Sequence, residues 1–534
     1  MSAFQIRISR RSFLQAAGLT ALAGGLAACG STAQSTAPAA SAPAYSLENA
    51  VKAEFTDSGI TLSPENASGC TVEGTVLTIT AAGTYAVSGS CADGSIQIGK
   101  GTEDVTLVLN GLTLTSTTTA PLVCGKSSGV TLAAAEGTEN TLTDGEANNK
   151  DNENASEEAE SAVVKCKDGS QVVLCGTGTL NLHAVGKNGI KSGTTEEDRD
   201  ASLTIRALTL NIDAPVNDAI NAEQQLNVES GTLNIAAGDD AVHCDLYLNV
   251  GAEGTDGPTI NISTCSEGLE AAEMNIYSGK IDITASDDCL NAANSDLGDY
   301  AFVMNIMGGT INAYSTEGDG FDSNGTLTIS GGNIAVWTAN TADNQPLDAD
   351  GLITITGGTI LAAGGSSGMD CSISAEQPYV TYGGSREKLG LASGAGLSVC
   401  DADGKALYTA ATVCSTNFVF FSSPELSDGA TYTLTADSSE IAAADAQTGE
   451  VAAGMSGGPG GGQAPGNGPA PADGQTPPEA PEGTTPPDNG QAPAEGRTPP
   501  DGKTPPTDGQ RPAGGPPPQD AGDTAAAVDS TATV

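Results

Sequence analysis

The chain has 534 residues and carries 66 acidic against 20 basic residues, for a formal net charge of −46. This length would accommodate about two to four ordinary domains. So acidic a chain is a poor partner for nucleic acid or anionic membrane surfaces, and we expect neither; divalent cations are favoured instead. Glycine is abundant at 69 residues and aromatic residues make up only 4% of the chain, which is typical of short strands joined by tight corners.

The first 29 residues are interpreted as an export signal rather than as part of the fold. The motif S-R-R-S-F-L-Q at residues 9–15 resembles a twin-arginine signal, and the apolar run at 16–28 is too short for a spanning helix. The segment L-A-A-C-G at 26–30 resembles a bacterial lipobox, in which Cys29 receives the lipid. We therefore expect an exported protein, anchored by lipid on the outer side of the cytoplasmic membrane at the cell surface. An uncleaved N-terminal anchor is the alternative.

Composition divides the rest of the chain into three parts. Residues 30–45 are rich in Ser, Ala, Pro and Thr and are interpreted as a flexible linker. Residues 46–440 alternate apolar and polar residues and are expected to hold the folded domain, with β-rich caps at both ends. Residues 441–534 become rich in Pro, Gly and Asp and repeat T-P-P-D-G, so we expect a disordered tail that cannot bury a core.

A short phrase recurs through the folded domain: a small residue, an apolar residue, a polar or acidic residue and another small residue. Its apolar positions are Val163, Ile190, Ile220, Val242, Leu269, Leu290, Phe321, Leu347 and Met369. Successive positions lie 21 to 31 residues apart. A repeat of this length is the mark of a solenoid, in which each unit buries its apolar face only by stacking on its neighbours.

The segments between the phrases predict the kind of solenoid. Runs such as L-N-V-E-S-G-T-L-N-I at 226–235 and L-I-T-I-T-G-G-T-I-L-A at 352–362 alternate in period two, and their Gly pairs mark corners between short strands. With three strands per repeat and no helical pattern, the sequence predicts an all-β parallel β-helix. Leucine-rich repeats share the period, but their leucine spacing and Asn turn are missing.

Cysteine usage predicts two disulfides. Eleven cysteines remain after Cys29, an odd number that leaves at least one unpaired. Disulfides persist in an exported protein, and we expect the pairs Cys70–Cys91 and Cys400–Cys414, which flank strand-and-turn segments. No C-x-x-C pair is present, so zinc ribbons and thioredoxin-type redox sites are unsupported.

Acidic residues recur beside the apolar position of the phrase. Stacked strands would bring them about 4.8 Å apart, where carboxylates repel one another unless a proton or a cation intervenes. Clusters of oxygen ligands with almost no imidazole or thiolate suit calcium. The predicted ligands are Asp218, Asp240, Glu267, Glu270, Asp288, Asp319, Asp322, Asp348, Asp350 and Asp370. The alternative is a solvated acidic face without ions, and the loop pattern of an EF-hand is absent.

A second column of outward residues belongs to the third strand of each repeat. In it Tyr314 and Trp337 fall on adjacent repeats, and flat rings so placed predict a platform for sugar rings. The alternative is that a loop covers both rings as a satellite core. Nearby asparagines are expected to hydrogen-bond one another or sugar hydroxyls: Asn181, Asn211, Asn234, Asn261 and Asn312. Both histidines are interpreted as incidental, and no Ser-His-Asp order, P-loop or H-E-x-x-H motif is present.

The chain contains the segments T-I-T-A-A-G-T-Y-A-V-S-G-S at 78–90, L-V-L-N-G-L-T-L at 107–114 and V-F-F-S-S-P-E-L-S-D-G-A-T-Y-T-L at 419–434. These and other segments resemble a bacterial surface family, the carbohydrate-binding domain-containing proteins. The resemblance covers residues 46–440. It implies a right-handed parallel β-helix that binds plant cell-wall polysaccharide, such as cellulose or acidic pectin-like chains, and holds calcium. It does not imply hydrolysis, and the many cysteines and the twin-arginine signal depart from the family.

We therefore predict a monomer that binds polysaccharide at the cell surface without cleaving it. A polysaccharide lyase or glycosidase is the first alternative. A lyase needs a base beside its calcium ligands. The candidate bases are Lys191, Arg206 and Lys280, and none of them falls in the stack of Asp322, Asp348 and Asp370. A paired-acid glycosidase stays open. A structural or adhesive protein without sugar specificity is the second alternative.

Overall fold

The computed structural model describes residues 41, 44–197, 199–339, 344–366, 368–369, 371–384 and 387–451. The expected signal sequence with Cys29, most of the expected linker, the chain from residue 452 onwards and the predicted ligand Asp370 lie outside these residues.

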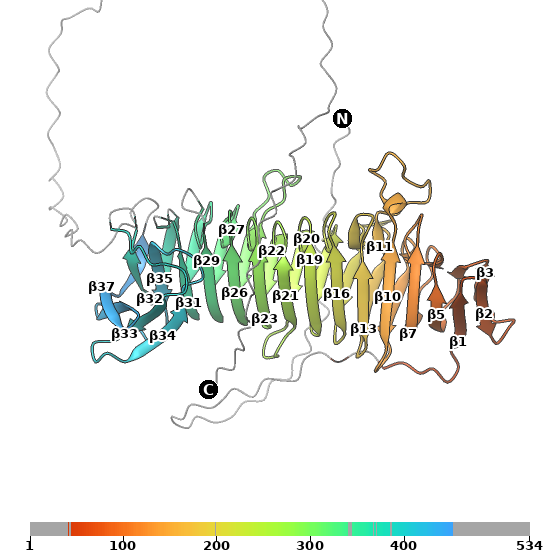
Figure 1. The fold of residues 1–534 in the computed structure, drawn as a ribbon, viewed down its shortest axis with the longest axis horizontal. Coiled ribbons are helices and arrows are strands. Elements are labelled where there is room, and N and C mark those ends of the chain that lie inside the picture. The colour runs from red at the N-terminus through yellow and green to blue at the C-terminus, as the bar shows by residue number, and fades with distance from the viewer. Residues whose placement is uncertain are drawn as a thin grey trace, which may run out of the picture. The chain divides into compact units, whose positions relative to one another are not determined.

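The described chain is all-β, as predicted. Its strands form one 34-stranded sheet and one 4-stranded sheet. Most pairings in the large sheet are parallel and join a strand to one that follows about three strands later, as for β13, β16 and β19. Such pairings form three rows, which are named here the ladder row, the second row and the groove row. Figure 1 shows the strands of the groove row side by side, from β7 to β31.

The ladder row carries the repeated phrase. Its strands are β4 (Val76–Ile79), β6 (Ser95–Ile98), β8 (Leu122–Cys124), β11 (Ala162–Cys166), β14 (Asn188–Ser192), β17 (Ile220–Ala222), the first parts of β20 (Val242–Val250) and β22 (Leu269–Ile276), β24 (Leu290–Ala292) and β27 (Phe321–Ser323).

The second row follows the ladder row along the chain in each repeat. Its strands are β9 (Gly129–Ala134), β12 (Gln171–Gly176), β15 (Ser202–Ile205), β18 (Gln225–Val228), the last parts of β20 and β22, β25 (Val303–Ile306), β28 (Thr326–Ile329), β30 (Leu352–Ile355) and β32 (Ser372–Gly383).

The groove row completes each repeat. Its strands are the last part of β7 (Val105–Ser116), β10 (Glu139–Asp144), β13 (Thr179–His183), β16 (Thr209–Ala214), β19 (Thr232–Ala237), β21 (Thr259–Thr264), β23 (Lys280–Ala285), β26 (Thr310–Ser315), β29 (Asn333–Thr338) and β31 (Thr359–Gly364).

Other strands close the two ends of the rows. At the first end lie β1 (Val51–Thr56), β2 (Gly59–Ser63), β3 (Cys70–Glu73) and β5 (Gly83–Cys91). At the last end, β35 (Phe418–Ser422) pairs antiparallel with both β31 and β32, and β38 (Gln447–Val451) pairs with β32. The small antiparallel sheet consists of β33 (Gly396–Cys400), β34 (Ala406–Ala411), β36 (Thr431–Ala436) and β37 (Ser439–Asp445). Strands thus continue to Val451, beyond the predicted boundary at 440.

The repeated phrase holds the predicted register, with one correction. Ile190, Ile220 and Val242 are successive partners in the ladder row, and all three are buried. The first member of the series is Val164, not Val163, because Val164 pairs with Ile190. Each fully buried side chain of this size contributes about 1.5–3 kcal/mol, so the stacked apolar column stabilises the body along its length.

The cysteines differ from the prediction. Cys70, Cys91, Cys400 and Cys414 are buried free thiols, so neither predicted disulfide is formed in this structure. Cys414 instead directs its thiol to the backbone oxygen of Thr338, at 3.4 Å. Cys70 and Cys91 pack in the main apolar core, and Cys414 packs in the core cluster around Trp337.

One short helix, the 3₁₀ helix η1 (Glu146–Asn148), lies between β10 and β11 in the described chain. No helix in that part of the chain has the length and hydropathy to cross a membrane.

Candidate functional site

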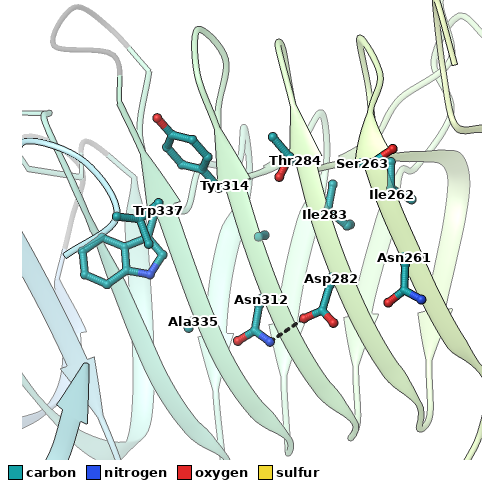
Figure 2. Close-up of a pocket in the computed structure, with 12 residues that line it drawn as sticks. Asn261, Ile262, Ser263, Asp282, Ile283, Thr284, Asn312, Tyr314, Ala335 and Trp337 are labelled. Atoms are coloured by element: carbon teal, nitrogen blue, oxygen red, sulfur yellow. Dashed lines mark hydrogen bonds between the residues drawn. The ribbon is translucent and has the colours of Figure 1, made fainter. Parts of the chain in front are cut away.

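Two hollows on the groove row meet and form one open groove. Their volumes are about 440 Å³ and about 320 Å³, and both are lined by Asn261 and Ser263. Figure 2 shows two parallel lines of side chains in the larger hollow: Asn261, Asp282 and Asn312 in one, and Ser263, Thr284 and Tyr314 in the other. The alternation of the strands produces these lines, because every second side chain points out of the sheet.

A hydrogen-bonded line of asparagines runs along this groove, as the sequence predicts. The Asn211 Nδ2 donates to Asn181 Oδ1 over 2.7 Å, and Asn234 to Asn211 and Asn261 to Asn234 over 2.8 Å each. A side-chain amide has two N–H donors and an oxygen with two lone pairs. Within the line, Asn211 and Asn234 each use one N–H and one oxygen lone pair. Each side chain therefore keeps a second N–H and a second lone pair for a hydrogen bond to another group.

Asp282 takes the asparagine position on β23. It accepts a hydrogen bond from Asn312 Nδ2 at 2.6 Å and forms an ion pair with Lys280 at 2.7 Å. Burial raises the pKa of Asp282, but the contacts with Lys280 and Asn312 outweigh burial and lower the pKa below its ordinary value. The groove therefore contains an ionised carboxylate.

The two hollows join at an irregularity of the sheet. Ile235 pairs with Ile262, but Ala236 pairs with Thr264, so Ser263 is an extra residue opposite β19. Its hydroxyl donates to the backbone oxygen of Ile235 at 3.2 Å. Bulges of this kind redirect side chains and are common beside functional sites.

The predicted aromatic platform is wrong for Trp337. Tyr314 and Trp337 are register partners, as expected, but Trp337 is only 4% exposed and belongs to a core cluster with Leu397, Val399 and Phe421. The satellite-core alternative is therefore correct for Trp337, because β33 and β35 pack over it. Tyr314 is half-buried at the edge of that cluster, and both Tyr314 and the nearly enclosed Trp337 border the larger hollow.

The acids along the ladder row are buried at Asp218 and Asp240 and half-buried at most of the other positions. Glu270 and Asp322 each pair in register with Asn291. Burial, with neighbouring carboxylates adding to it, raises the pKa of several predicted ligands: Glu267 to about 8, Asp288 and Asp319 to about 7, and Asp218 and Asp322 to about 6. Because these pKa values are raised, ionising the carboxyl groups of this column costs free energy unless a cation is present.

Three predicted ligands meet near the last strands of the ladder row. The carboxylate oxygens of Asp319, Asp322 and Asp348 lie within 4.8 Å of one another. Asp350 is exposed, and its charge contributes to the raised pKa of Asp322. The structure describes four of the acids predicted at this end. It brings three of them together: Asp319, Asp322 and Asp348.

Asn291 lies between these acids and those of the preceding strand. Its Nδ2 donates to Glu267 Oε2 over 2.9 Å, whereas its Oδ1 is buried and has no hydrogen-bond partner among the described residues. The residue is 7% exposed. A buried carbonyl oxygen without a donor is costly, and a cation that takes oxygen ligands would satisfy it.

A second group of ligand atoms lies around His243 on β20, a residue that the sequence analysis interprets as incidental. The imidazole is enclosed by Asp240, Asp245 and Glu270. Burial lowers the pKa of His243, but the hydrogen bonds with these carboxylates outweigh burial and hold the pKa well above its usual range. A stronger signal was available in the sequence, because the phrase A-V-H-C places this imidazole in the column of acids.

Comparison with known proteins agrees with the resemblance found in the sequence. A carbohydrate-binding domain-containing protein of Acetivibrio thermocellus is 29% identical over 144 residues, which are 27% of this chain and 49% of the relative. The matched segment thus spans about half the length of that relative. A solved structure titled as a polysaccharide lyase-like protein from C. thermocellum, a gadolinium derivative, is 21% identical, covers 57% of this chain and 96% of its own, and superposes with a TM-score of 0.32.

The family model described as carbohydrate-binding domain-containing protein matches residues 73–368, more than half of the chain. This range includes the groove between β13 and β29 and the acids of the ladder row up to Asp348. The chain belongs to the family of carbohydrate-binding domain-containing proteins.

Proposed function

We propose that this protein binds polysaccharide in the groove of the groove row without cleaving it. The observation that carries the proposal is the line of Asn181, Asn211, Asn234 and Asn261 along an open groove. Neighbouring strands lie about 4.8 Å apart, so the line repeats one polar group at a constant interval. A polymer of sugar units presents hydroxyls that also recur at a constant interval, and an open groove admits such a chain anywhere along its length.

Tyr314 supplies the apolar part of the proposed site. A half-buried ring held at the edge of a packed cluster loses little conformational entropy when a sugar ring stacks on it. The acidic groups Asp213 and Asp282 line the groove, and like charges repel. Between the two candidate ligands, a neutral cellulose-like chain is therefore favoured over an acidic pectin-like chain.

The rows support a right-handed parallel β-helix as the architecture. Parallel partners such as Asn211 and Asn234 belong to successive repeats, and each repeat visits the ladder, second and groove rows in the same order. Connections between parallel strands of one sheet are right-handed in nearly all proteins. The stack explains why one long surface, rather than a compact pocket, bears the proposed sugar site.

Calcium is the proposed occupant of the acids around Asp319, Asp322 and Asp348. The cluster supplies only oxygen atoms, the ligands that calcium prefers. Asn291, with its unpartnered buried oxygen, lies on the adjoining strand and is the register partner of Asp322. A divalent cation would relieve the carboxylate repulsion and would supply the missing partner.

A binding role is favoured over catalysis by two features. The candidate bases are held by carboxylates, since Lys191 pairs with Glu223 at 3.2 Å, and Arg206 with Glu229 at 2.7 Å. The carboxyl groups with strongly raised pKa belong to the ladder row, whereas the carboxylate with a lowered pKa, Asp282, lies in the groove. A general acid must be protonated at the working pH, which Asp282 is not.

The proposed setting is the cell surface. The export and lipobox motifs predict a protein tethered through Cys29 outside the cytoplasmic membrane, and we propose that it acts there as a monomer. Metabolic labelling with a fatty-acid analogue tests the tether: wild-type protein should carry the label, and Cys29→Ala should not.

The test of function is retention on insoluble cellulose, with analysis of soluble products. The double variant Asn234→Ala/Asn261→Ala should lose retention. The matched control is Asn249→Ala/Asn275→Ala, because these second-row residues form the same contact, at 3.2 Å, away from the groove. Equal retention of both variants would refute the assigned surface, and release of reducing ends or unsaturated sugars would refute the binding-only role. Polygalacturonate in place of cellulose tests the preference for a neutral chain.

A further inference from the structure

His243 faces two carboxylates through a single ring nitrogen. Its Nδ1 lies 3.1 Å from Asp240 Oδ2 and 2.9 Å from Glu270 Oε2. Glu270 is its register partner on β22, and Asp240 lies two residues before the start of β20. One ring nitrogen carries at most one hydrogen, so a single proton has to be shared between two carboxylates.

The same three atoms converge as metal ligands do. They all lie within 4.8 Å of one another. Ligand atoms held about 2.1 Å from a metal are about 3.0 Å apart at adjacent octahedral positions. For calcium, with ligands at about 2.4 Å, the same separation is about 3.4 Å. The separations from Nδ1, 3.1 Å and 2.9 Å, are closer to the value for the smaller ion than to that for calcium.

The other ring nitrogen has the contact that orients a ligating histidine. Its Nε2 lies 3.3 Å from Asp245 Oδ1. Metal-bound imidazoles almost always donate their second N–H to a carboxylate or carbonyl group, which fixes the tautomer and makes the ligating nitrogen more basic. Asp245 is thus a positioning residue, and a metal ion would bind at Nδ1 in place of the shared proton, which is released to solvent.

We infer that Asp240, His243 and Glu270 form a site for a divalent transition-metal ion of the zinc or manganese type, oriented by Asp245. One imidazole and two carboxylates are a ligand set that such borderline ions accept, whereas calcium takes oxygen ligands. The side chains of Asp240 and Glu270 are only 12% and 13% exposed, so the ion would be largely withdrawn from solvent. It would tie β20 to β22 across successive repeats.

This site differs from the proposed calcium site and does not depend on sugar binding. The cluster of Asp319, Asp322 and Asp348 contains no nitrogen ligand. The ladder row therefore carries two cation sites of different chemistry, and each is removed by variants that leave the other intact.

The experiment uses the full chain, purified without a histidine tag and stripped with chelator. Zn²⁺, Mn²⁺ and Ca²⁺ are titrated separately by calorimetry, and Co²⁺ serves as a spectroscopic probe of its own ligands. The variants are His243→Asn and Asp245→Asn. The control is His183→Asn, which removes the other of the two histidines. Melting curves without metal establish that each variant is folded.

We expect one Zn²⁺ or Mn²⁺ per chain in the wild type and in the control. Binding should be lost in His243→Asn and weakened by about 10- to 100-fold in Asp245→Asn, while Ca²⁺ binding persists in both. If His243→Asn does not fold, the affinity of Asp245→Asn for Zn²⁺ and Mn²⁺ still tests the inference. The inference is overturned if Zn²⁺ and Mn²⁺ do not bind, if binding is unchanged in these variants, or if bound Co²⁺ shows thiolate charge-transfer bands.

Discussion

Tyr314 and Trp337 are register partners on adjacent strands of the groove row, yet only Tyr314 remains half-buried while Trp337 is 4% exposed. The strands that follow β32 account for the difference, because they place Val399 and Phe421 in one core cluster with Trp337. Both residues border the larger hollow, but Trp337 is enclosed by the packing of the last strands, whereas Tyr314 stays partly exposed.

Replacing each ring by alanine should separate these roles. Trp337→Ala should lower the free energy of unfolding by about 3–5 kcal/mol, the usual cost of deleting a large buried ring. Tyr314→Ala should cost less stability but should weaken retention on cellulose, since its ring lines the groove. Denaturant unfolding and the retention assay measure the two effects. Unchanged retention in Tyr314→Ala would remove the ring from the proposed site.

Removing one acid of the Asp319, Asp322 and Asp348 cluster should abolish stabilisation by calcium. A ligand present at 100 times its Kd stabilises the folded state by about 2.7 kcal/mol, so calcium should raise the melting temperature of the wild type. Asp322→Asn should show no such rise, because the variant loses a charged ligand.

The control for calcium is Asp213→Asn, which removes an exposed acid of the groove row. This variant should keep the full rise in melting temperature with calcium. It also tests whether removing any negative charge would produce the loss expected for Asp322→Asn. If neither calcium nor chelator changes the melting temperature of the wild type, calcium is not bound at Asp319, Asp322 and Asp348.

The parts of this structure that follow a repeat were predictable. The spacing of Ile190, Ile220 and Val242 predicted their register, because a parallel stack places equivalent residues of each repeat together. The first member was misplaced by one residue, since Val163 and Val164 are adjacent and both are buried. The line of asparagines was predictable for the same reason.

Contacts that depend on the ends of the stack or on side-chain direction were not predictable. The strands that cover Trp337 come from residues 396–436, about 60 to 100 positions later. His243 was interpreted as incidental, and only the structure shows both of its ring nitrogens facing carboxylates.

The metal-free protein should lose stability as the pH rises from about 5 to about 8. Burial raises the pKa of Glu267 from 4.5 to about 8 and that of Asp288 from 3.8 to about 7. Between those values the folded state retains protons that the unfolded state has released, so stability falls with rising pH. Melting temperatures measured in chelator across this range test the sign. Glu267→Gln should flatten the profile, and a profile that rises through this range would contradict the burial of these acids.

The cysteines should be found as thiols that react slowly while the protein is folded. Cys70, Cys91, Cys400 and Cys414 are buried and unbonded, and burial raises the pKa of the Cys414 thiol, which lowers the fraction of reactive thiolate. Differential alkylation, with one label before denaturation and a second after it, should place the second label on all four residues without any reduction step. Cys400→Ser and Cys414→Ser should each shift the melting temperature equally with or without reductant. A label that appears on Cys400 and Cys414 only after reduction would show that the protein forms the disulfide that this structure lacks.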